Sequence, residues 1–379
     1  MLSVLAPYLE RLWGPFRLFQ SHIMLIGMGV VGGAILTFFI LPRLSFILPC
    51  DRGRPFASAK DESRGKPTGA GLIMMLALLP VLFLVLPPGV RMWQIAVCLA
   101  AAMFSGYFDD RGTAAWSEGR KLLLDFSVAF ATSLVFSRGR PVSIWLPLLD
   151  QAVTLPVWLY LIVAVTVLMV AINATNCSDG VDGLAGTLTL VSLFYLGGFL
   201  YAIVGHREIA DYLLVPHNPV GAVWAILVFS AAGVLAGYLW YNAEPSSVLM
   251  GDAGSRLFGL LVGVAVLASG NPFLIFSITP VVLLNGGTGL VKLLLLRLFK
   301  RLGFDVRSPA RIAEDRAKQT PASNGRTSGM IALLHRVRFP LHDHCLKNLG
   351  WSKPQVLIRF FLLQTFLIPI LLVLLVKLR

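Results

Sequence analysis

Apolar runs long enough to cross a lipid bilayer recur along the whole chain. A helix that spans the hydrocarbon core needs about 20 predominantly apolar residues. Because lipid offers no partner for backbone N–H and C=O groups, a helical bundle is the architecture that such runs predict. We therefore predict an all-α integral membrane protein with about ten transmembrane helices. The predicted spans are residues 23–41, 71–86, 93–108, 122–136, 155–172, 184–204, 220–240, 257–268, 273–298 and 356–376.

The composition agrees with a membrane protein. Of the 379 residues, 56% are hydrophobic and 13% are charged, whereas about 25% of the residues in a soluble domain are charged. The apolar runs are spread over both halves, so residues 1–379 are predicted to form one transmembrane domain, with a polar insertion at 303–335. The four cysteines lie far apart and form no CxxC pair, which argues against a zinc ribbon and a disulfide framework.

The formal charge of +13 is distributed as a membrane topology rather than as a nucleic-acid surface. Lys and Arg gather after the first, third and ninth apolar runs and are sparse after the even-numbered runs. By the positive-inside rule, loops after odd-numbered runs face the cytoplasm and both termini lie outside. No nucleic-acid partner is predicted.

Polar clusters fall on that same predicted cytoplasmic face. Each cluster follows an odd-numbered run. Acidic residues at a membrane boundary are costly unless they are paired or bind a metal, so they are functional candidates. One isolated Asp is explained equally well as a solvated helix end, but four clusters on one face favour a site. Their candidate residues are Asp109, Asp110, Asn173, Asn176, Asp179, Asp182, Asn242, Asp252, His342 and His344.

Carboxylates with carboxamide neighbours form a hard-oxygen environment that suits magnesium or manganese better than zinc. Magnesium binds one or two protein carboxylates together with substrate phosphates, which points to phosphate chemistry. Glycines in the segments 180–186 and 251–254 allow backbone to approach an anion closely. Asp179 or Ser178 is expected to cap the helix that follows. A P-loop, a serine-hydrolase elbow and a zinc-protease motif are all missing from the sequence.

A transporter is the alternative from another functional class. It also buries carboxylates and breaks helices at glycines, but its site is expected near the bilayer midplane. Because the acidic clusters are predicted at one membrane face, the sequence favours an enzyme.

Several motifs resemble those of the polyprenyl-phosphate N-acetylhexosamine-1-phosphate transferases, and the resemblance covers most of the chain. Three blocks are shared by the whole family: GYFDD at 106–110, NATNCSDGVDG at 173–183, and YNA at 241–243 with MGDAGS at 250–255. Two more, GKPTGAG at 65–71 and PLHDH at 340–344, are similar to the branch that transfers phospho-N-acetylmuramoyl-pentapeptide.

The resemblance implies the reaction. Undecaprenyl phosphate would attack the β-phosphate of a UDP-linked phospho-N-acetylmuramoyl-pentapeptide and release UMP, the first membrane step of peptidoglycan synthesis. This places the chain in a bacterial inner membrane and is compatible with a homodimer. The alternative within the family is a transferase for UDP-N-acetylglucosamine or another UDP-hexosamine, which would feed a different surface polymer.

The resemblance also assigns roles. Mg²⁺ would be held chiefly by Asp252, with Asp109 or Asp110 near the metal or the attacking phosphate, and His342 would join the catalytic set. Whether Asp109 acts as a base or at the metal stays open, and Lys121 is equally explained as a membrane anchor. The expected substrate contacts are Arg64, Lys121, Asn173, Asn176, Asp179, Gly180, Val181, Asp182, Asn242, Leu249 and His344.

The chain departs from the family pattern at a few positions. Leu249 replaces the aromatic residue expected against uracil, Asp343 interrupts a histidine triplet, and Thr113 replaces a lysine. These departures concern nucleotide and sugar recognition and leave the aspartates in place, so the reaction type is predicted more firmly than the substrate.

Overall fold

The computed structural model describes residues 1–51, 63–112, 116–149, 151–306 and 329–377. In chain order its elements are α1 (Leu2–Leu9), η1 (Gly14–Gln20), α2 (His22–Leu44), η2 (Ser45–Ile47), α4 (Gly71–Val85), α5 (Val90–Arg111), α6 (Glu118–Ser137), β1 (Val142–Ile144), β2 (Val153–Leu155), α7 (Val157–Ser178), α8 (Leu184–Gly198), η3 (Phe199–Ile203), α9 (Arg207–Tyr212), α10 (Gly221–Asn242), α11 (Gly251–Ala268), α12 (Leu274–Ile278), α13 (Pro280–Val282), η4 (Leu283–Gly287), α14 (Thr288–Arg301), α16 (Gly329–Arg336), α17 (Leu341–Lys347) and α18 (Lys353–Lys377).

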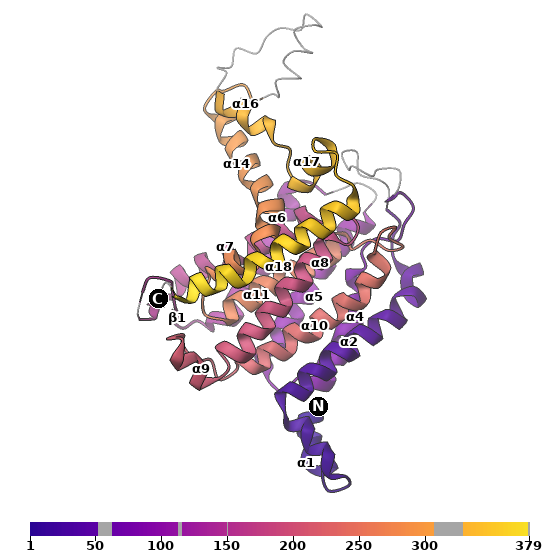
Figure 1. The fold of residues 1–379 in the computed structure, drawn as a ribbon, viewed down its shortest axis with the longest axis vertical. Coiled ribbons are helices and arrows are strands. Elements are labelled where there is room, and N and C mark those ends of the chain that lie inside the picture. Colours follow the sequence, from indigo (N-terminus) through magenta and orange to yellow (C-terminus); the bar gives the residue numbers. More distant parts are fainter. Residues whose placement is uncertain (52–62, 113–115, 150, 307–328, 378–379) are drawn as a thin grey trace, which may run out of the picture.

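The long helices lie side by side in a bundle, with α1 at one end and α14 projecting from the other (Figure 1). Within the described residues, seven helices are long and apolar enough to cross a membrane, which confirms a multi-pass membrane protein. They correspond to the predicted runs one, three, five to eight and ten. The two runs at 71–86 and 122–136 form α4, which is shorter, and α6, which carries charged residues.

The ninth predicted span is not one continuous helix. Residues 273–298 were expected to form a single element, but they are divided among α12, α13, the π-helical turn η4 and α14. Pro280 begins α13, and because proline has no N–H it cannot continue the ladder of the preceding helix. In η4, a Cβ on Gly286 would overlap the carbonyl oxygen of Ala174. The glycine therefore permits a close approach between η4 and α7, the packing that its place in an apolar run predicts.

The prediction of an all-α fold is wrong in one place. Strands β1 and β2 form an antiparallel hairpin in which Ser143 lies opposite Thr154, and α7 begins only after it. The hairpin is tied to the end of α11 through Trp145. Its backbone N–H donates to the Gly270 carbonyl at 3.0 Å, and its indole Nε1 donates to the Ser269 carbonyl at 2.9 Å.

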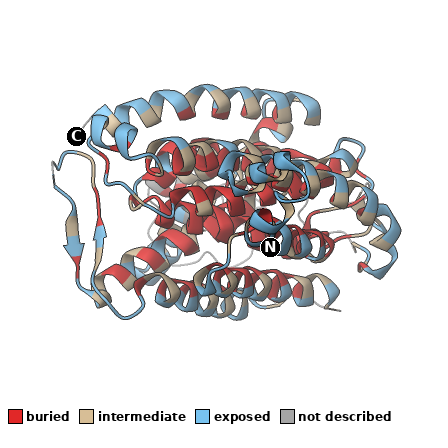
Figure 2. Cartoon of the chain, turned by 90° about the horizontal axis from the view of Figure 1, so that it is seen from below, coloured by how far each residue is buried: buried red, intermediate tan, exposed pale blue. Residues whose placement is uncertain are grey.

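Helix α11 is the centre of the bundle, since all of its residues are buried. Figure 2 shows buried helices in the middle of the molecule, surrounded by helices that are partly exposed. Glycines at the contacts between α11 and its neighbours make this packing possible. A Cβ on Gly71 of α4 or on Gly106 of α5 would overlap backbone atoms at the beginning of α11, and a Cβ on Gly259 would lie 2.7 Å from the Cα of Ile172 in α7. The neighbouring helices thus reach backbone contact with α11, which fixes its position.

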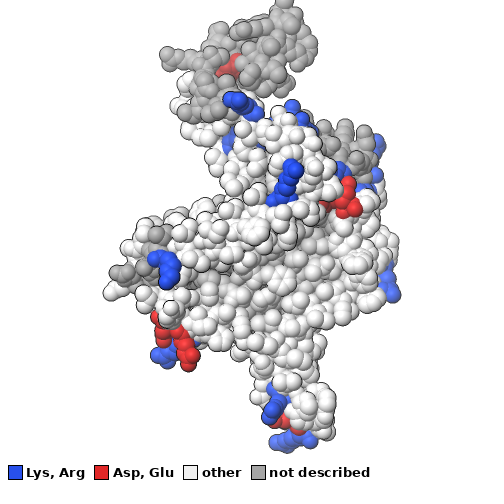
Figure 3. Space-filling model, viewed as in Figure 1, with Lys and Arg blue, Asp and Glu red and all other residues white. Residues whose placement is uncertain are grey.

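Charged side chains gather toward the ends of the helices and leave an uncharged middle on the face shown in Figure 3. This distribution is the one expected of a chain whose middle lies in lipid. The side of the membrane on which each end lies remains a prediction.

Candidate active site

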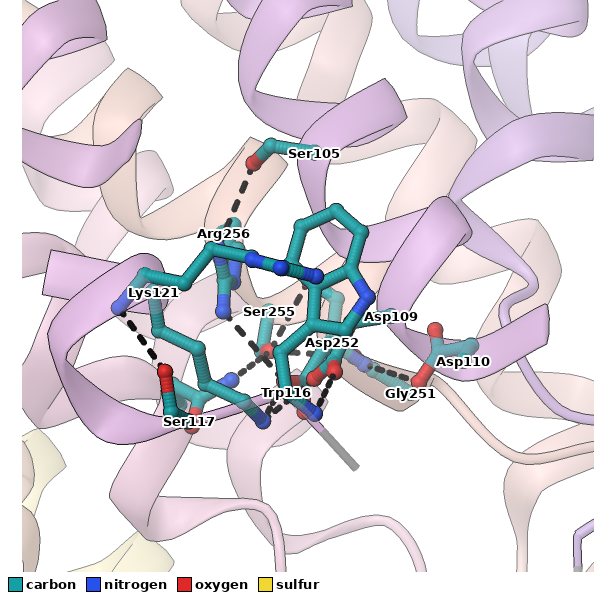
Figure 4. Close-up of polar contacts among 12 residues, drawn as sticks. Ser105, Asp109, Asp110, Trp116, Ser117, Lys121, Gly251, Asp252, Ser255 and Arg256 are labelled. Carbon is teal, nitrogen blue, oxygen red and sulfur yellow. Dashed lines mark hydrogen bonds and ion pairs between the residues drawn. The ribbon is translucent and has the colours of Figure 1, made fainter. Parts of the chain in front are cut away.

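A cluster of acidic side chains lies where α5, α6 and α11 meet at one end of the bundle (Figure 4). Asp109 lies in the last turn of α5, and Asp252 lies in the first turn of α11. Both side chains are buried. Lys121 of α6 joins them. Its Nζ forms an ion pair with Oδ2 of Asp109 and lies 3.0 Å from Oδ2 of Asp252. The backbone N–H of Trp116 donates to the other oxygen, Oδ1, of Asp109 at 2.9 Å.

Asp110, next to Asp109 in the sequence, binds the backbone at the beginning of α11. Its two carboxylate oxygens each accept a backbone N–H from the first turn of α11, from Asp252 and from Ala253, both at 3.0 Å. The first N–H groups of a helix have no partner within the helix, and a carboxylate there satisfies them and interacts favourably with the helix dipole. Asp110 therefore caps α11 from outside and holds the backbone of Asp252 against α5.

Beneath the cluster, a buried arginine connects the three helices. Arg256 lies one turn after Asp252 and is 2% exposed. Its Nη2 lies 3.5 Å from Oδ2 of Asp252, and its Nη1 lies 3.0 Å from Oδ1 of Asp125 in α6. The same Nη1 also donates to the hydroxyl of Ser105 in α5 at 3.3 Å.

The donor set of this cluster fits a magnesium ion only in partnership with a substrate. Among the described residues, no group of three or more His, Cys, Asp or Glu side chains could hold a metal ion by itself. Two buried carboxylates, those of Asp109 and Asp252, do meet at one place, around Nζ of Lys121. Magnesium commonly uses one or two carboxylates and completes its shell with waters and substrate phosphates. The residues present therefore fit that mode of binding.

The segment that follows α7 joins the acidic cluster to a second group of predicted residues. Asn176 donates from Nδ2 to the hydroxyl of Ser255 at 2.9 Å, so it lies beside the first turn of α11. Asn173 turns its amide back to the carbonyl of Met169 in its own helix. Asp179 directly follows α7, and its N–H donates to the carbonyl of Asn176.

The N-cap of α8 is neither Asp179 nor Ser178, so that prediction is wrong. The residue before α8 is Gly183, with a φ of +76° that favours glycine. Its N–H donates to Oδ1 of Asn242 at 2.9 Å, and Nδ2 of Asn242 donates to the carbonyl of Val248 at 2.9 Å. Buried and bonded on both sides, Asn242 ties the loop after α7 to the segment that leads into α11.

Asp182 and Leu249 contact the segment that precedes α4. Lys66 lies 3.7 Å from Oδ2 of Asp182, and the same oxygen accepts the N–H of Ser246 at 3.1 Å. Leu249 donates its backbone N–H to the carbonyl of Pro67 at 2.8 Å. Arg64, in contrast, is exposed.

His342 lies against the glycine loop. Its backbone N–H donates to Oδ1 of Asn285 at 2.9 Å, and its ring Nδ1 lies 3.1 Å from the same oxygen. On the other side of the ring, a Cβ on Gly180 would overlap Nε2. Burial lowers the pKa of His342 to about 4. The ring is therefore neutral at pH 7, and since a carboxamide oxygen can only accept, Nδ1 carries the proton and Nε2 is an acceptor facing Gly180.

The other predicted residues of this region have local roles. His344 accepts the N–H of Arg338 at Nδ1, at 3.4 Å, and Asp343 pairs with Lys347 at 3.5 Å. Val181 is 6% exposed and packs with apolar residues of α8 and α18. Its side chain thus belongs to the core, whatever its backbone contacts.

Comparison with known proteins shows the family. The model of glycosyl transferase family 4 matches residues 92–270. The phospho-N-acetylmuramoyl-pentapeptide-transferases of two strains of Treponema pallidum, one of them strain Nichols, are each 42% identical over 382 residues, which cover 100% of this chain and 97% of those proteins. The protein of the same name from Nautilia profundicola is 31% identical over 262 residues, 64% of this chain and 72% of its own length.

The chain belongs to the phospho-N-acetylmuramoyl-pentapeptide-transferase family. The resemblance found in the sequence motifs is thereby confirmed. In this member of the transferase family, the four predicted polar clusters form a connected set at one end of the bundle. Asp110 contacts α11, Asn176 contacts Ser255, Asn242 contacts Gly183, and Gly180 lies against His342.

The motifs of this transferase family did not point to Arg256, Asp125 or Asn285. Each is a polar residue within or beside an apolar run, and that position was the available signal. Arg256 directly follows the motif at 250–255, and Asn285 directly precedes two glycines. Residues 307–328 of the predicted insertion, and Thr113, lie outside the described residues.

Proposed function

We propose that the chain transfers phospho-N-acetylmuramoyl-pentapeptide from its UDP conjugate to undecaprenyl phosphate, with release of UMP. The observation that carries this proposal is the 42% identity, over the full chain, to the Treponema pallidum proteins that bear the name of this activity. The acidic cluster at the end of an apolar bundle supports it, because a lipid phosphate and a water-soluble nucleotide can meet there. The chain is thus a phosphoglycosyl transferase.

The reaction breaks one phosphoanhydride bond and forms another. An oxygen of the lipid phosphate attacks the β-phosphorus of the UDP conjugate, and the bond between that phosphorus and the bridging oxygen breaks. The bridging oxygen leaves with UMP, and the lipid keeps a diphosphate that carries the sugar. Phosphoryl transfer of this kind depends mostly on positioning and charge neutralisation.

Magnesium is proposed as the cofactor, and the pairing of the Asp109 and Asp252 carboxylates around one cation supports it. Asp252 would be the main protein ligand and Asp109 the second. When bound, the ion would neutralise the diphosphate charge. Asp110 would contribute indirectly, since both of its oxygens hold the first turn of α11.

Lys121 is proposed to bind the diphosphate, which its reach to both carboxylates supports. A positive charge on α6 at that depth would stabilise the negative charge that gathers on the leaving UMP. As an alternative to its role as second ligand, Asp109 is a candidate for the base or for the partner of the attacking phosphate. The N–H of Trp116, which its Oδ1 accepts, orients the carboxylate.

The nucleotide and sugar are proposed to bind along the loop after α7. Gly180 and Asp182 lie on this loop, where Gly180 lies against His342 and Asp182 pairs with Lys66. His342 is proposed to act through this loop, since its ring is buried and its Nε2 lies against Gly180. Eight further residues complete the proposed set of substrate contacts, through side chain or backbone. They are Asn173, Asn176, Asp179, Val181, Asn242, Leu249, Arg64 and His344.

The proposal extends to location and assembly. The active site is placed on the cytoplasmic face of a bacterial inner membrane and both termini on the periplasmic face, which the distribution of Lys and Arg in the sequence supports. Labelling of single cysteines introduced near each terminus tests the topology. A homodimer stays a prediction, and the mass of the detergent-solubilised protein tests it.

The experiment that tests the function is UMP release by the purified protein with magnesium and undecaprenyl phosphate. UDP-N-acetylmuramoyl-pentapeptide and UDP-N-acetylglucosamine are offered in separate reactions. Release from the pentapeptide conjugate alone is the expected result. Release from UDP-N-acetylglucosamine alone would contradict the proposal and favour the alternative branch of the family.

A further inference from the structure

Arg256 carries a charge into the most deeply buried helix of the bundle. It lies in α11, whose residues are all buried, and its side chain is 2% exposed. A charge at such a depth is costly unless it is paired and hydrogen-bonded. Its presence in an otherwise apolar stretch therefore requires a compensating arrangement, and the contacts around it supply one.

The guanidinium of Arg256 connects three helices through its two terminal nitrogens. Nη1 reaches Asp125 of α6 at 3.0 Å and Ser105 of α5 at 3.3 Å, and Nη2 reaches Asp252 at 3.5 Å. The third nitrogen, Nε, is buried and has no hydrogen-bond partner among the described residues. The orientation of the side chain is thus set by its contacts to Asp125, Ser105 and Asp252.

The charges form an alternating sequence that runs from the surface of the cluster into the bundle. Lys121 lies between Asp109 and Asp252, and Arg256 lies between Asp252 and Asp125. Asp125 and Lys121 are four residues apart and therefore lie on the same side of α6. Asp125 neutralises Arg256, so the arginine can contact Asp252 without adding a net positive charge near it.

We propose that Arg256, neutralised by Asp125, is a positioning residue that holds the Asp252 carboxylate in place for a divalent cation and the substrate diphosphate. The planar guanidinium suits this task because it binds two carboxylates in fixed directions, which a lysine ammonium does not. Groups that orient a metal-binding carboxylate from behind commonly change metal affinity or activity by about 10- to 100-fold when they are removed. This inference rests on the proposed function of the same site.

The test removes the ion pair as a whole. In the double variant Arg256→Met and Asp125→Leu, both charges are replaced by apolar groups, a change that is often neutral for stability when a buried pair is exchanged in full. Each variant is examined for thermal unfolding in detergent, for binding of Mn²⁺ alone by its electron paramagnetic resonance signal, and for UMP release.

The double variant is expected to unfold near the temperature of the parent protein. Its Mn²⁺ affinity and its kcat for UMP release are expected to fall by about tenfold or more, with a smaller change in KM for the UDP conjugate. A folded double variant with Mn²⁺ affinity and kcat equal to those of the parent would overturn the proposal, since a merely structural pair would behave in that way.

A second variant keeps the proposal testable if the double variant does not fold. Arg256→Lys keeps the charge but presents one nitrogen, which cannot serve Asp125 and Asp252 in the same directions. It is expected to lose Mn²⁺ affinity and kcat together, and parental values of both would overturn the proposal. Arg297→Gln, on the exposed side of α14, is the matched control and should change neither quantity.

The two hypotheses can fail separately. Mn²⁺ binding and thermal unfolding require no substrate, so they decide the role of Arg256 even if the parent protein releases no UMP from either UDP-sugar. In that case the proposed function fails while the metal-binding comparison still stands.

Discussion

Helices α11 and α14 both carry charged side chains, but they place them by different physical means. Every residue of α11 is buried, and its Asp252 and Arg256 are held by ion pairs with other helices. None of the described side chains of α14 is buried, and the helix projects from the bundle (Figure 1). Its Arg297 pairs with Glu118 of α6, and both side chains are more than half exposed.

The difference shows what fixes the position of a charged side chain in this protein. In α11 the position of a charge follows from backbone packing, because glycines at its contacts with α4, α5 and α7 bring these helices against its backbone. In α14 the pair of Arg297 with Glu118 is exposed, so its position needs no such support. Changes around α11 should therefore affect activity strongly, whereas equivalent changes in α14 should have little effect.

The largest effect is expected from Asp252→Asn. The substitution is nearly isosteric and removes the charge that meets Lys121 and the proposed cation. UMP release should fall by at least about 100-fold, while the unfolding temperature in detergent stays close to that of the parent. Full activity in this variant would exclude Asp252 as a ligand of the metal.

His342 lies close to the beginning of α14, since its partner Asn285 lies in η4, directly before that helix. The pKa of this histidine is lowered by burial to about 4, below its unfolded value, so the unfolded chain binds more protons between these values. Stability should be complete above about pH 6.5 and fall as the pH drops toward 4, by up to about 3 kcal/mol.

Thermal unfolding at pH 7, 6 and 5 measures this effect. The variant His342→Gln, which cannot be protonated in this range, is the control and should show a smaller loss of unfolding temperature over the same pH range. An identical pH dependence in both proteins would assign it to other groups.

A matched pair of glycine substitutions tests the packing difference directly. Gly106→Ala places a Cβ against the backbone of Asp252, whereas a Cβ on Gly289 of α14 would lie 3.5 Å from the Cβ of Phe339, an ordinary contact. The first change should lower the free energy of unfolding by about 1 to 3 kcal/mol and should also lower UMP release. The second change should leave the free energy of unfolding unchanged or raise it slightly, because alanine favours a helix more than glycine does. Equal effects on unfolding temperature would contradict the proposed role of close packing around α11.

The smallest effect is expected from Arg297→Gln. The pair with Glu118 is exposed to water, where such pairs contribute about 0 to 1 kcal/mol. The unfolding temperature should change little, and UMP release should equal that of the parent. A marked loss of activity would show that α14 supports the site through this contact and would weaken the contrast with α11.

The parts of the fold that depend on local composition could be predicted from the sequence. Long apolar runs require helices in lipid, and seven of the described helices fit this requirement. The prediction of one helix for the ninth run was wrong because a mostly apolar composition does not show where the backbone departs from a regular α-helix. Pro280 begins a new helical segment and Leu283–Gly287 form a π-helical turn. The hairpin of β1 and β2 was missed because its strands are only 3 residues each.

The candidate site was predictable where a motif carries its chemistry. Asp109, Asp110 and Asp252 were identified from their place after odd-numbered apolar runs and from the family resemblance, and the structure brings them to one place. The motif does not show that the adjacent aspartates have different partners. Only the fold shows that Asp110 accepts two N–H groups of α11. Arg256 was missed because it lies between the motif and the apolar run predicted at 257–268, and its partners come from other helices.

The close packing around α11 also has a consequence for motion during turnover. Where backbone touches backbone, there are no side-chain rotamers that can adjust, so α11 cannot slide or rotate without separating its neighbours. Any movement that admits a lipid and a nucleotide is therefore expected in the segments that contact α11, such as the loop after α7, rather than in α11 itself.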